Sequence, residues 1–211
     1  MSKRILVAGA TGAVGKRLLP LLVAEGYSVS GTTRSPDKTK IIEGAGAHAI
    51  VVDVFDSAAL ARAVRDARPQ IIIHQLTDLP PGLDPARMAD AVPRNARIRS
   101  EGTRNLVTAA LAAGASRLIS QSIAWRSQGI SAEGVQMLEH LTLESPPLEG
   151  IVLRYGHLYG PGTGRPQPSG ELPCHVDVAA AAALIAIDKG EPGIFSVVDW
   201  DPYLRVPSGT K

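Results

Sequence analysis

The sequence predicts an α/β protein built on a doubly wound parallel sheet, and two observations support this prediction. Short β-branched runs alternate with longer amphipathic stretches along the 211 residues. This alternation is typical of strand-helix-strand units joined by right-handed crossovers. The strand candidates are also continuous apolar runs, such as IIIH at 71–74 and AIVV at 49–52, which indicates that helices cover both faces of the sheet.

Each strand candidate is a short apolar or β-branched run bounded by a helical stretch or a turn. In chain order the candidates span 4–8, 28–33, 48–52, 70–75, 117–121, 151–154 and 193–198. A single domain, 1–211, is expected to hold all of them, because 45% hydrophobic residues can fill one continuous core. A Pro/Gly-rich stretch at 161–173 interrupts the alternation and is expected to be a loop or linker.

The first helix candidate follows the first strand. It places Val14, Leu18, Leu21 and Leu22 on one face, and Gly26 lies beyond its end as a stop signal. This face is therefore expected to pack against the sheet.

Later helix candidates follow the same rule. A helix over 57–67 begins after Asp56 or Ser57, either of which is a good cap, and another runs over 132–144. The residues expected to face inward from these two helices are Leu60, Val64, Val135, Leu138 and Leu141.

Charge and composition exclude several kinds of partner. The 22 basic and 20 acidic residues are scattered and give a net charge of +2, so neither nucleic acid nor a membrane surface is expected as a partner. Cys174 is the single cysteine, which favours a reducing compartment. Cys174 and His175 are adjacent but have no second pair of ligands, so no metal site is expected. A cytoplasmic protein with a small-molecule substrate is the expectation, and the oligomeric state is left open.

A glycine-rich turn links the first strand to the first helix. In ILVAGATGAVGKRLLP at 5–20, Gly9 suits a tight turn, Gly12 a close approach of backbone to a pyrophosphate, and Gly15 close packing of helix on strand. The helix N-terminus would offer its N–H groups to the phosphates. A nucleotide P-loop does not fit, because Arg17 follows Gly15-Lys16 where Ser or Thr is needed. Dinucleotide binding is therefore predicted, with a purely structural glycine turn as the alternative.

The spacing GATGAVG resembles the short-chain dehydrogenase/reductase superfamily in its extended or atypical branch, the NAD-dependent epimerase/dehydratase family. The resemblance runs from residue 3 to about 200 and implies a Rossmann fold. It also implies a reduced C-terminal substrate region, 155–211. The further motifs that carry it are IIIHQLT at 71–77, EGTRNLVTAA at 101–110, SQSIA at 120–124, IVLRYGHLYGPGT at 151–163, HVDVAAAAALIAI at 175–187 and GIFSVVD at 193–199.

The end of the second strand indicates which cofactor is preferred. Arg34 stands where an acidic residue would bind the adenosine ribose of NAD, and Ser35 and Lys38 follow it. These residues favour a 2′-phosphate and hence NADP, with NAD still possible; the alternative is an exposed loop arginine. After the third strand, Asp53-Val54 resembles the family's adenine-contacting pair, although Asp53 is as well suited to a turn or cap.

The remaining site residues follow from the resemblance. Ser122 matches the catalytic serine at the end of the fifth strand, where it would polarise the substrate oxygen. His74 ends a buried strand and is expected to be a satisfied core histidine. The cofactor-binding residues expected are Gly9, Thr11, Gly12, Ala13, Val14, Gly15, Arg34, Ser35, Asp53, Val54, Leu76, Thr77, Ser120, Tyr155, His157 and Leu158.

The sequence departs from the family at the catalytic Tyr and Lys, which lie four residues apart on the helix after the fifth strand. Ser131 and Val135 stand at the corresponding positions, and Arg99 replaces a usual Asn in the fourth helix. Two functions remain open. One is an NADP(H)-dependent oxidoreductase or epimerase/dehydratase-like enzyme acting on a small carbonyl or alcohol with a degenerate catalytic set. The other is an inactive module that senses NADP(H).

Overall fold

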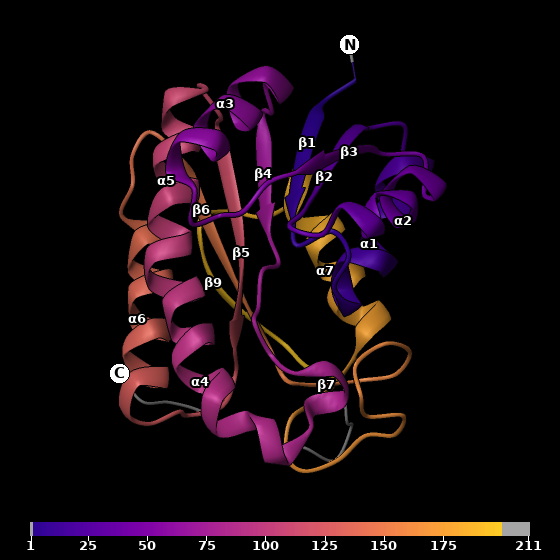
Figure 1. The fold of residues 1–211 in the computed structure, drawn as a ribbon, viewed down its shortest axis with the longest axis vertical. Coiled ribbons are helices and arrows are strands. Elements are labelled where there is room, and N and C mark those ends of the chain that lie inside the picture. The colour runs from indigo at the N-terminus through magenta and orange to yellow at the C-terminus, as the bar shows by residue number, and fades with distance from the viewer. Residues whose placement is uncertain (1, 200–211) are drawn as a thin grey trace.

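A computed structural model describes residues 2–199 of the chain. Within this range a seven-stranded parallel sheet forms the centre of the molecule, in the order β3-β2-β1-β4-β5-β6-β9 (Figure 1). Its strands are β1 (Arg4–Ala8), β2 (Ser28–Thr33), β3 (His48–Val51), β4 (Ile71–His74), β5 (Arg117–Ile123), β6 (Glu149–Tyr155) and β9 (Gly193–Val197). The prediction of a doubly wound parallel sheet is confirmed.

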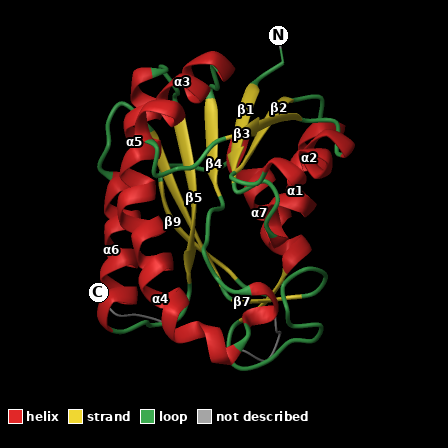
Figure 2. Ribbon diagram, in the orientation of Figure 1, coloured by secondary structure: helices red, strands yellow, loops and turns green. Residues whose placement is uncertain are grey.

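Helices cover both faces of this sheet (Figure 2). One layer contains α1 (Ala13–Ala24), α2 (Thr39–Gly44) and α7 (Val176–Asp188), and the other contains α3 (Ser57–Ala67), α4 (Met88–Arg97), α5 (Thr103–Ala112) and α6 (Gly129–Leu143). Each layer buries its own apolar cluster against the sheet. The continuous apolar strands follow from this arrangement, because both of their faces are buried.

The strand order reverses between β1 and β4. β2 and β3 lie on one side of β1, whereas β5, β6 and β9 lie beyond β4. The loops that leave the carboxyl ends of β1 and β4 therefore diverge, and a crevice opens between them. In open α/β sheets, ligands bind at such a switch point.

The predicted elements differ from the observed ones mainly at their ends. β5 and β6 are longer than predicted, and α6 begins three residues earlier than the predicted 132. The placement of Leu21 on the inner face of α1 is wrong: Leu21 is 37% exposed, and Leu19 is buried in its place. Val14, Leu18 and Leu22 already fill the stripe that faces the sheet, and the neighbouring row that continues this stripe runs through Gly15 and Leu19.

Two features have no counterpart among the predicted elements. A short second sheet pairs β7 (His157–Tyr159) with β8 (Pro173–His175). A π-helical turn, Ile98–Gly102, joins α4 to α5. Of the shortened region predicted at 155–211, the part from 200 onward lies outside the described residues.

Candidate cofactor and substrate site

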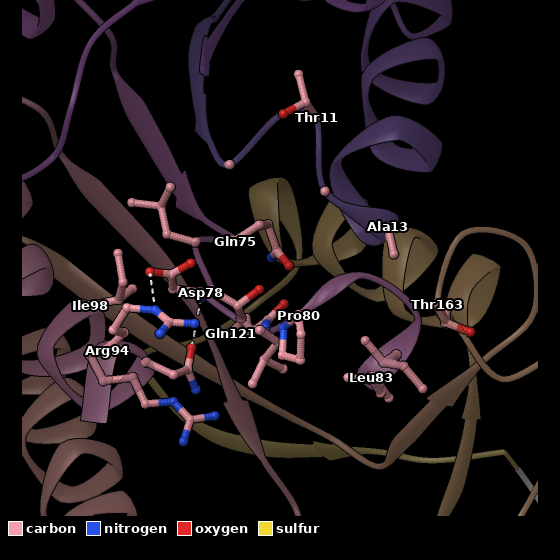
Figure 3. A pocket seen from close by; sticks show the side chains of 18 of the residues that line it. Thr11, Ala13, Gln75, Asp78, Pro80, Leu83, Arg94, Ile98, Gln121 and Thr163 are labelled. Carbon is pink, nitrogen blue, oxygen red and sulfur yellow. Dashed lines mark hydrogen bonds and ion pairs between the residues drawn. The ribbon is translucent and has the colours of Figure 1, made fainter. Parts of the chain in front are cut away.

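A cavity of about 840 Å³ opens at the carboxyl ends of β1, β2, β4, β5 and β6. Its volume suits a ligand the size of a drug or cofactor. Gln75 and Gln121 lie near its centre, and two loops close the far side. Figure 3 shows these glutamines between one wall with Asp78, Arg94 and Ile98 and another with Leu83 and Thr163.

The glycine turn forms the wall nearest β1. Gly9 has φ +88°, and a Cβ there would lie 2.7 Å from the carbonyl oxygen of Gln75. A Cβ on Gly15 would lie 2.5 Å from the carbonyl oxygen of Gly9, so the helix could not pack as closely. A Cβ on Gly12 meets only the Gly9 carbonyl oxygen, at 3.3 Å. Gly12 thus leaves open space in the cavity, as the approach of a phosphate requires.

The N-terminus of α1 is aimed at this open space. Gly12 caps the helix, and the first helical hydrogen bond runs from the Lys16 N–H to the Gly12 carbonyl. The N–H groups of residues 13–15 precede that bond and are free to bind an anion. Thr11 and Ala13 line the cavity, whereas the side chain of Val14 faces the core. Neither Val14 nor Gly15 lines the cavity.

Arg34 lies on the rim of the cavity, directly after β2. Its side chain is 62% exposed, and its Nη2 atom is 3.0 Å from Asp78 Oδ1. Asp78 Oδ2 also lies 3.4 Å from Arg94 Nε. The backbone N–H of Asp78 donates a hydrogen bond to the side-chain oxygen of Asn95. Ser35 lines the cavity beside Arg34. The basic group expected at this strand end is thus present, with an internal carboxylate as its partner.

Asp53 and Val54 line the cavity after β3. The Asp53 carboxylate accepts a hydrogen bond from the Phe55 N–H at 2.9 Å, as a turn residue does. The side-chain amide of Asn105 donates a hydrogen bond to the Val54 carbonyl oxygen. Leu76 and Thr77 line the opposite wall after β4. These residues form one continuous surface between Arg34 and the glycine turn.

Ser122 lies at the end of β5, lines the cavity and is 1% exposed. Its Oγ is 2.6 Å from Glu139 Oε1 on α6. Arg154 donates two further hydrogen bonds to the same carboxylate, at 2.8 and 2.6 Å. Burial alone would raise the pKa of Glu139, but the hydrogen bonds and charges around it outweigh burial and hold the pKa below its ordinary value. Because an ionised carboxylate can only accept hydrogen bonds, Ser122 donates its one hydroxyl hydrogen to Glu139.

Ser120 does not reach the cavity. Its side chain is fully buried, and its hydroxyl accepts a hydrogen bond from the Thr142 hydroxyl at 2.8 Å. Ser120 and Ser122 point to the same face of β5, toward α6, because side chains alternate along a strand. Ser120 lies two residues further from the strand end and is therefore covered by α6. The structure does not place its side chain with the other predicted cofactor residues.

The groups that could supply a proton are poorly suited to do so. Ser131 lines the cavity where the family's Tyr would lie, and Val135 is half-buried one helical turn later. Tyr155 is the one tyrosine among the described residues that line the cavity. Burial raises the pKa of Tyr155 far above its usual value, and Gln75 binds its hydroxyl.

Two histidines lie near the site in different environments. His74 is 1% exposed and contacts Thr103 and the Leu76 N–H. Burial first, and then the charge of Arg99, lower the pKa of His74 to about 4, so it is a neutral core residue as predicted. His157 lines the cavity and stacks on Trp125, with ring centroids 4.2 Å apart.

Leu158 also lines the cavity after β6. Two loops cover the cavity: residues 79–87 follow β4, and residues 160–172 follow β7. The second is the Pro/Gly-rich loop predicted at 161–173, whereas the first was not predicted. The two loops contact each other at Gly164 and Gly82. The approach is so close that a Cβ on Gly164 would lie 2.6 Å from the carbonyl carbon of Gly82. The Pro and Gly content of LPPGLDP at 79–85 was a usable signal for the first loop.

Among residues 2–199, no helix has both the length and the apolar character needed to cross a membrane. The described part of the chain also lacks any group of three or more His, Cys, Asp or Glu side chains that could hold a metal ion.

The fold and this site define a dinucleotide-binding protein of the doubly wound class. A family model described as NAD(P)H-binding matches residues 9–137. A curated Streptomyces protein, 3-diazoavenalumate denitrifying reductase, is 36% identical over 246 residues, which cover 94% of this chain and 77% of the relative. The chain therefore belongs to the NAD(P)H-binding family.

Solved structures show the same fold. The UDP-glucose 4-epimerase of Thermus thermophilus in complex with NAD is 23% identical, with a TM-score of 0.75 over 92% of this chain and 77% of the epimerase. The Bordetella bronchiseptica enzyme WbmH in complex with NAD⁺ is 17% identical, with a TM-score of 0.73 over 94% and 75% of the two chains. An engineered reductase is 15% identical, with a TM-score of 0.77 over 95% and 80%. The chain is thus an NAD(P)-binding protein related to a reductase, and a nicotinamide dinucleotide is its cofactor.

Proposed function

We propose that the chain is an NADP(H)-dependent reductase whose substrate accepts hydride without taking a proton from the protein. The observation that carries this proposal is that none of the described groups at the substrate end of the cavity is a ready acid: burial, and then the charge of Arg165, lower the pKa of His157, so its imidazole is neutral at pH 7. Ser122 directs its hydrogen to Glu139, Ser131 replaces the expected tyrosine, and burial raises the pKa of Tyr155. General acid catalysis typically contributes about 10²- to 10⁴-fold, so reduction of an ordinary carbonyl should be slow here.

The cofactor fits the residues present. Gly9, Thr11, Gly12 and Ala13 would hold the pyrophosphate, because Gly12 leaves open space in front of the α1 N-terminus. Arg34, with Ser35 and Lys38 beside it on the cavity wall, would hold a 2′-phosphate. When bound, the reduced nicotinamide supplies a hydride. The substrate side would be bounded by Ser122, Trp125 and His157.

An aromatic diazonium group meets the chemical requirement of such a site. Hydride adds its electron pair and hydrogen, the carbon–nitrogen bond breaks, N₂ leaves, and the ring carbon keeps the hydrogen. The overall reaction of an arenediazonium ion with hydride gives the arene and N₂, and no proton is consumed. The 36% identical relative is a denitrifying reductase of a diazo compound. This likeness supports a diazonium substrate here.

The test measures NADPH oxidation with a panel of arenediazonium salts with and without a ring carboxylate, together with aldehydes, ketones and quinones. We expect turnover of at least one diazonium salt to exceed turnover of every carbonyl. NADPH deuterated at C4 should place deuterium on the arene carbon that lost N₂, as mass spectrometry would show. The reaction without protein corrects for direct reduction by NADPH. Faster turnover of an aldehyde or ketone than of any diazonium salt would refute the proposal.

The second candidate function is a module that senses NADP(H) without catalysis, and the absence of the Tyr and Lys favours it. Tight NADPH binding by calorimetry, together with no turnover above the protein-free rate across the panel, would support the sensor and contradict the reductase.

A further inference from the structure

Arg99 is a buried cation of the cavity that the cofactor site leaves unused. It lies in the π-helical turn Ile98–Gly102, lines the cavity and is only 7% exposed. π-helical turns inside α-helices are frequent at functional sites. This turn adds a residue to the helix and changes the direction in which Arg99 leaves it. A charged side chain placed so deep in the fold needs a compensating partner.

The protein itself gives Arg99 no direct partner. The structure records no hydrogen bond or ion pair between its guanidinium and another described residue, and only the more distant charge of Glu139 favours its charged form. Glu139 is already bound by both Arg154 and Ser122. Burial first, and then the charge of Arg99, lower the pKa of His74 to about 4. His74 is therefore neutral and does not compensate the charge of Arg99.

The local charges therefore do not cancel. The charges of Arg99 and Arg154 both act on one carboxylate, Glu139, which leaves one surplus positive charge on the wall of the cavity that Ser122 also lines. Arg94 offers a contrast, because it comes from the same helical segment and lines the same cavity but pairs with Asp78 at 3.4 Å. A buried guanidinium without such a partner is preorganised to bind an anion through two parallel hydrogen bonds.

The surroundings of Arg99 favour a singly charged organic anion. Ile98 and Leu106 line the cavity near it along the chain, and Trp125 lies on the wall that follows Ser122. An apolar ring with a carboxylate would match these walls, with the ring on the apolar side chains and the carboxylate on the guanidinium. The strongly hydrated phosphates of the cofactor have their own sites at the glycine turn and Arg34.

We propose that Arg99 binds the carboxylate of the substrate, which is a small unsaturated or aromatic acid. This proposal rests on the reductase function above, since it assumes that a substrate enters the cavity beside Ser122. It makes Arg99 a specificity-determining residue that replaces the family's Asn at this position. Its test is a binding measurement, so that its outcome does not depend on turnover.

The experiment compares acids with their carboxamides on the NADP⁺-loaded protein. The probes are benzoate, cinnamate and 3-phenylpropionate, each with the matching amide, titrated by calorimetry or ligand-detected NMR. We expect at least one acid to bind about tenfold or more tightly than its amide, because charge-assisted hydrogen bonds to a buried guanidinium are lost in the amide. Equal affinities for each pair, or no saturable binding of any acid, would overturn the proposal. Acid binding with no reductase activity would contradict the reductase alone.

Variants then assign the preference to this residue. Arg99→Gln should abolish the preference for the acid, and Arg99→Lys should keep part of it, while NADPH affinity stays unchanged in both. Arg104→Gln is the matched control, because Arg104 lies five residues later and outside the cavity. Retention of the full preference in Arg99→Gln would refute the role of Arg99. If Arg99→Gln lost NADPH affinity by the same factor as it lost acid affinity, Arg99 would be assigned to the cofactor and the proposal would be refuted.

Discussion

Replacing Glu139 with Gln tests the cluster that holds Ser122 in place. Glu139 is 8% exposed, and its carboxylate accepts hydrogen bonds from Ser122 and, twice, from Arg154. Glutamine has the same shape, but it removes the charge and turns one acceptor into a donor. Loss of one partner from a buried ion pair costs about 3 to 5 kcal/mol. The Arg154 side chain is 39% exposed, so water offsets part of this cost, and we expect a loss of about 2 kcal/mol.

The pH dependence of this loss follows from the pKa of Glu139. The folded-state pKa lies below the ordinary value of 4.5, so the folded state holds the charged form more tightly than the unfolded chain does. The stabilisation is complete above about pH 4.5 and is lost as the pH falls through the folded-state pKa. The difference in free energy of unfolding between the wild type and Glu139→Gln should therefore narrow below pH 4.5.

Urea unfolding followed by tryptophan fluorescence at pH 7 and at pH 4 or below measures both effects. Glu133→Gln is the control, because Glu133 is an exposed carboxylate on the same helix. The reasoning would be refuted if both variants lost the same free energy at pH 7. It would also fail if the difference between the wild type and Glu139→Gln stayed constant down to pH 3.

Three further changes test the rest of the site. Gly12→Val should weaken NADPH binding about tenfold or more by calorimetry, because its side chain would occupy the open space before the α1 N-terminus; Gly44→Ala, which meets no atom within 4 Å, should leave it unchanged. Arg34→Asp should reverse a preference for NADPH over NADH of about tenfold or more, and equal wild-type affinities would contradict this. Ser122→Ala should leave the slow carbonyl reduction unchanged at every pH from 6 to 9, because Ser122 donates its only hydroxyl hydrogen to Glu139, and a clear loss of rate would show that Ser122 polarises the substrate oxygen.

The sheet and the geometry of the glycine turn could be predicted from the sequence because both depend on local patterns. Buried parallel strands must be continuously apolar, and the glycine turn needs a positive φ at Gly9 and close packing at Gly15. The positions of these residues in the fold follow directly from their spacing. Leu21 was misplaced because a helix with apolar residues on more than one row offers two possible inner faces, and only the packing of α1 against the sheet selects between them.

The substrate end could not be predicted in the same way, because its geometry depends on contacts between distant segments. The pairing of Ser122 with Glu139 requires α6 to lie across β5, and the same helix covers Ser120. The rim pair of Arg34 and Asp78 joins residues 44 positions apart. Arg99 was visible as a departure from the family's Asn, but its burial and its lack of a partner follow from the π-helical turn.

The two proposals constrain the substrate together. A diazonium group is a cation, and the surplus positive charge of Arg99 in the cavity would repel a simple arenediazonium ion. A carboxylate on the same molecule removes this difficulty, because the substrate is then a net-neutral zwitterion whose anionic end binds Arg99. The diazonium end would lie away from Arg99, and the fixed positive charge would keep it electron-poor and receptive to hydride. A site whose described residues include no ready acid, and which has a buried guanidinium with no partner among them, is therefore consistent with one kind of substrate: a small aromatic acid that carries its electrophilic group at the end opposite the carboxylate.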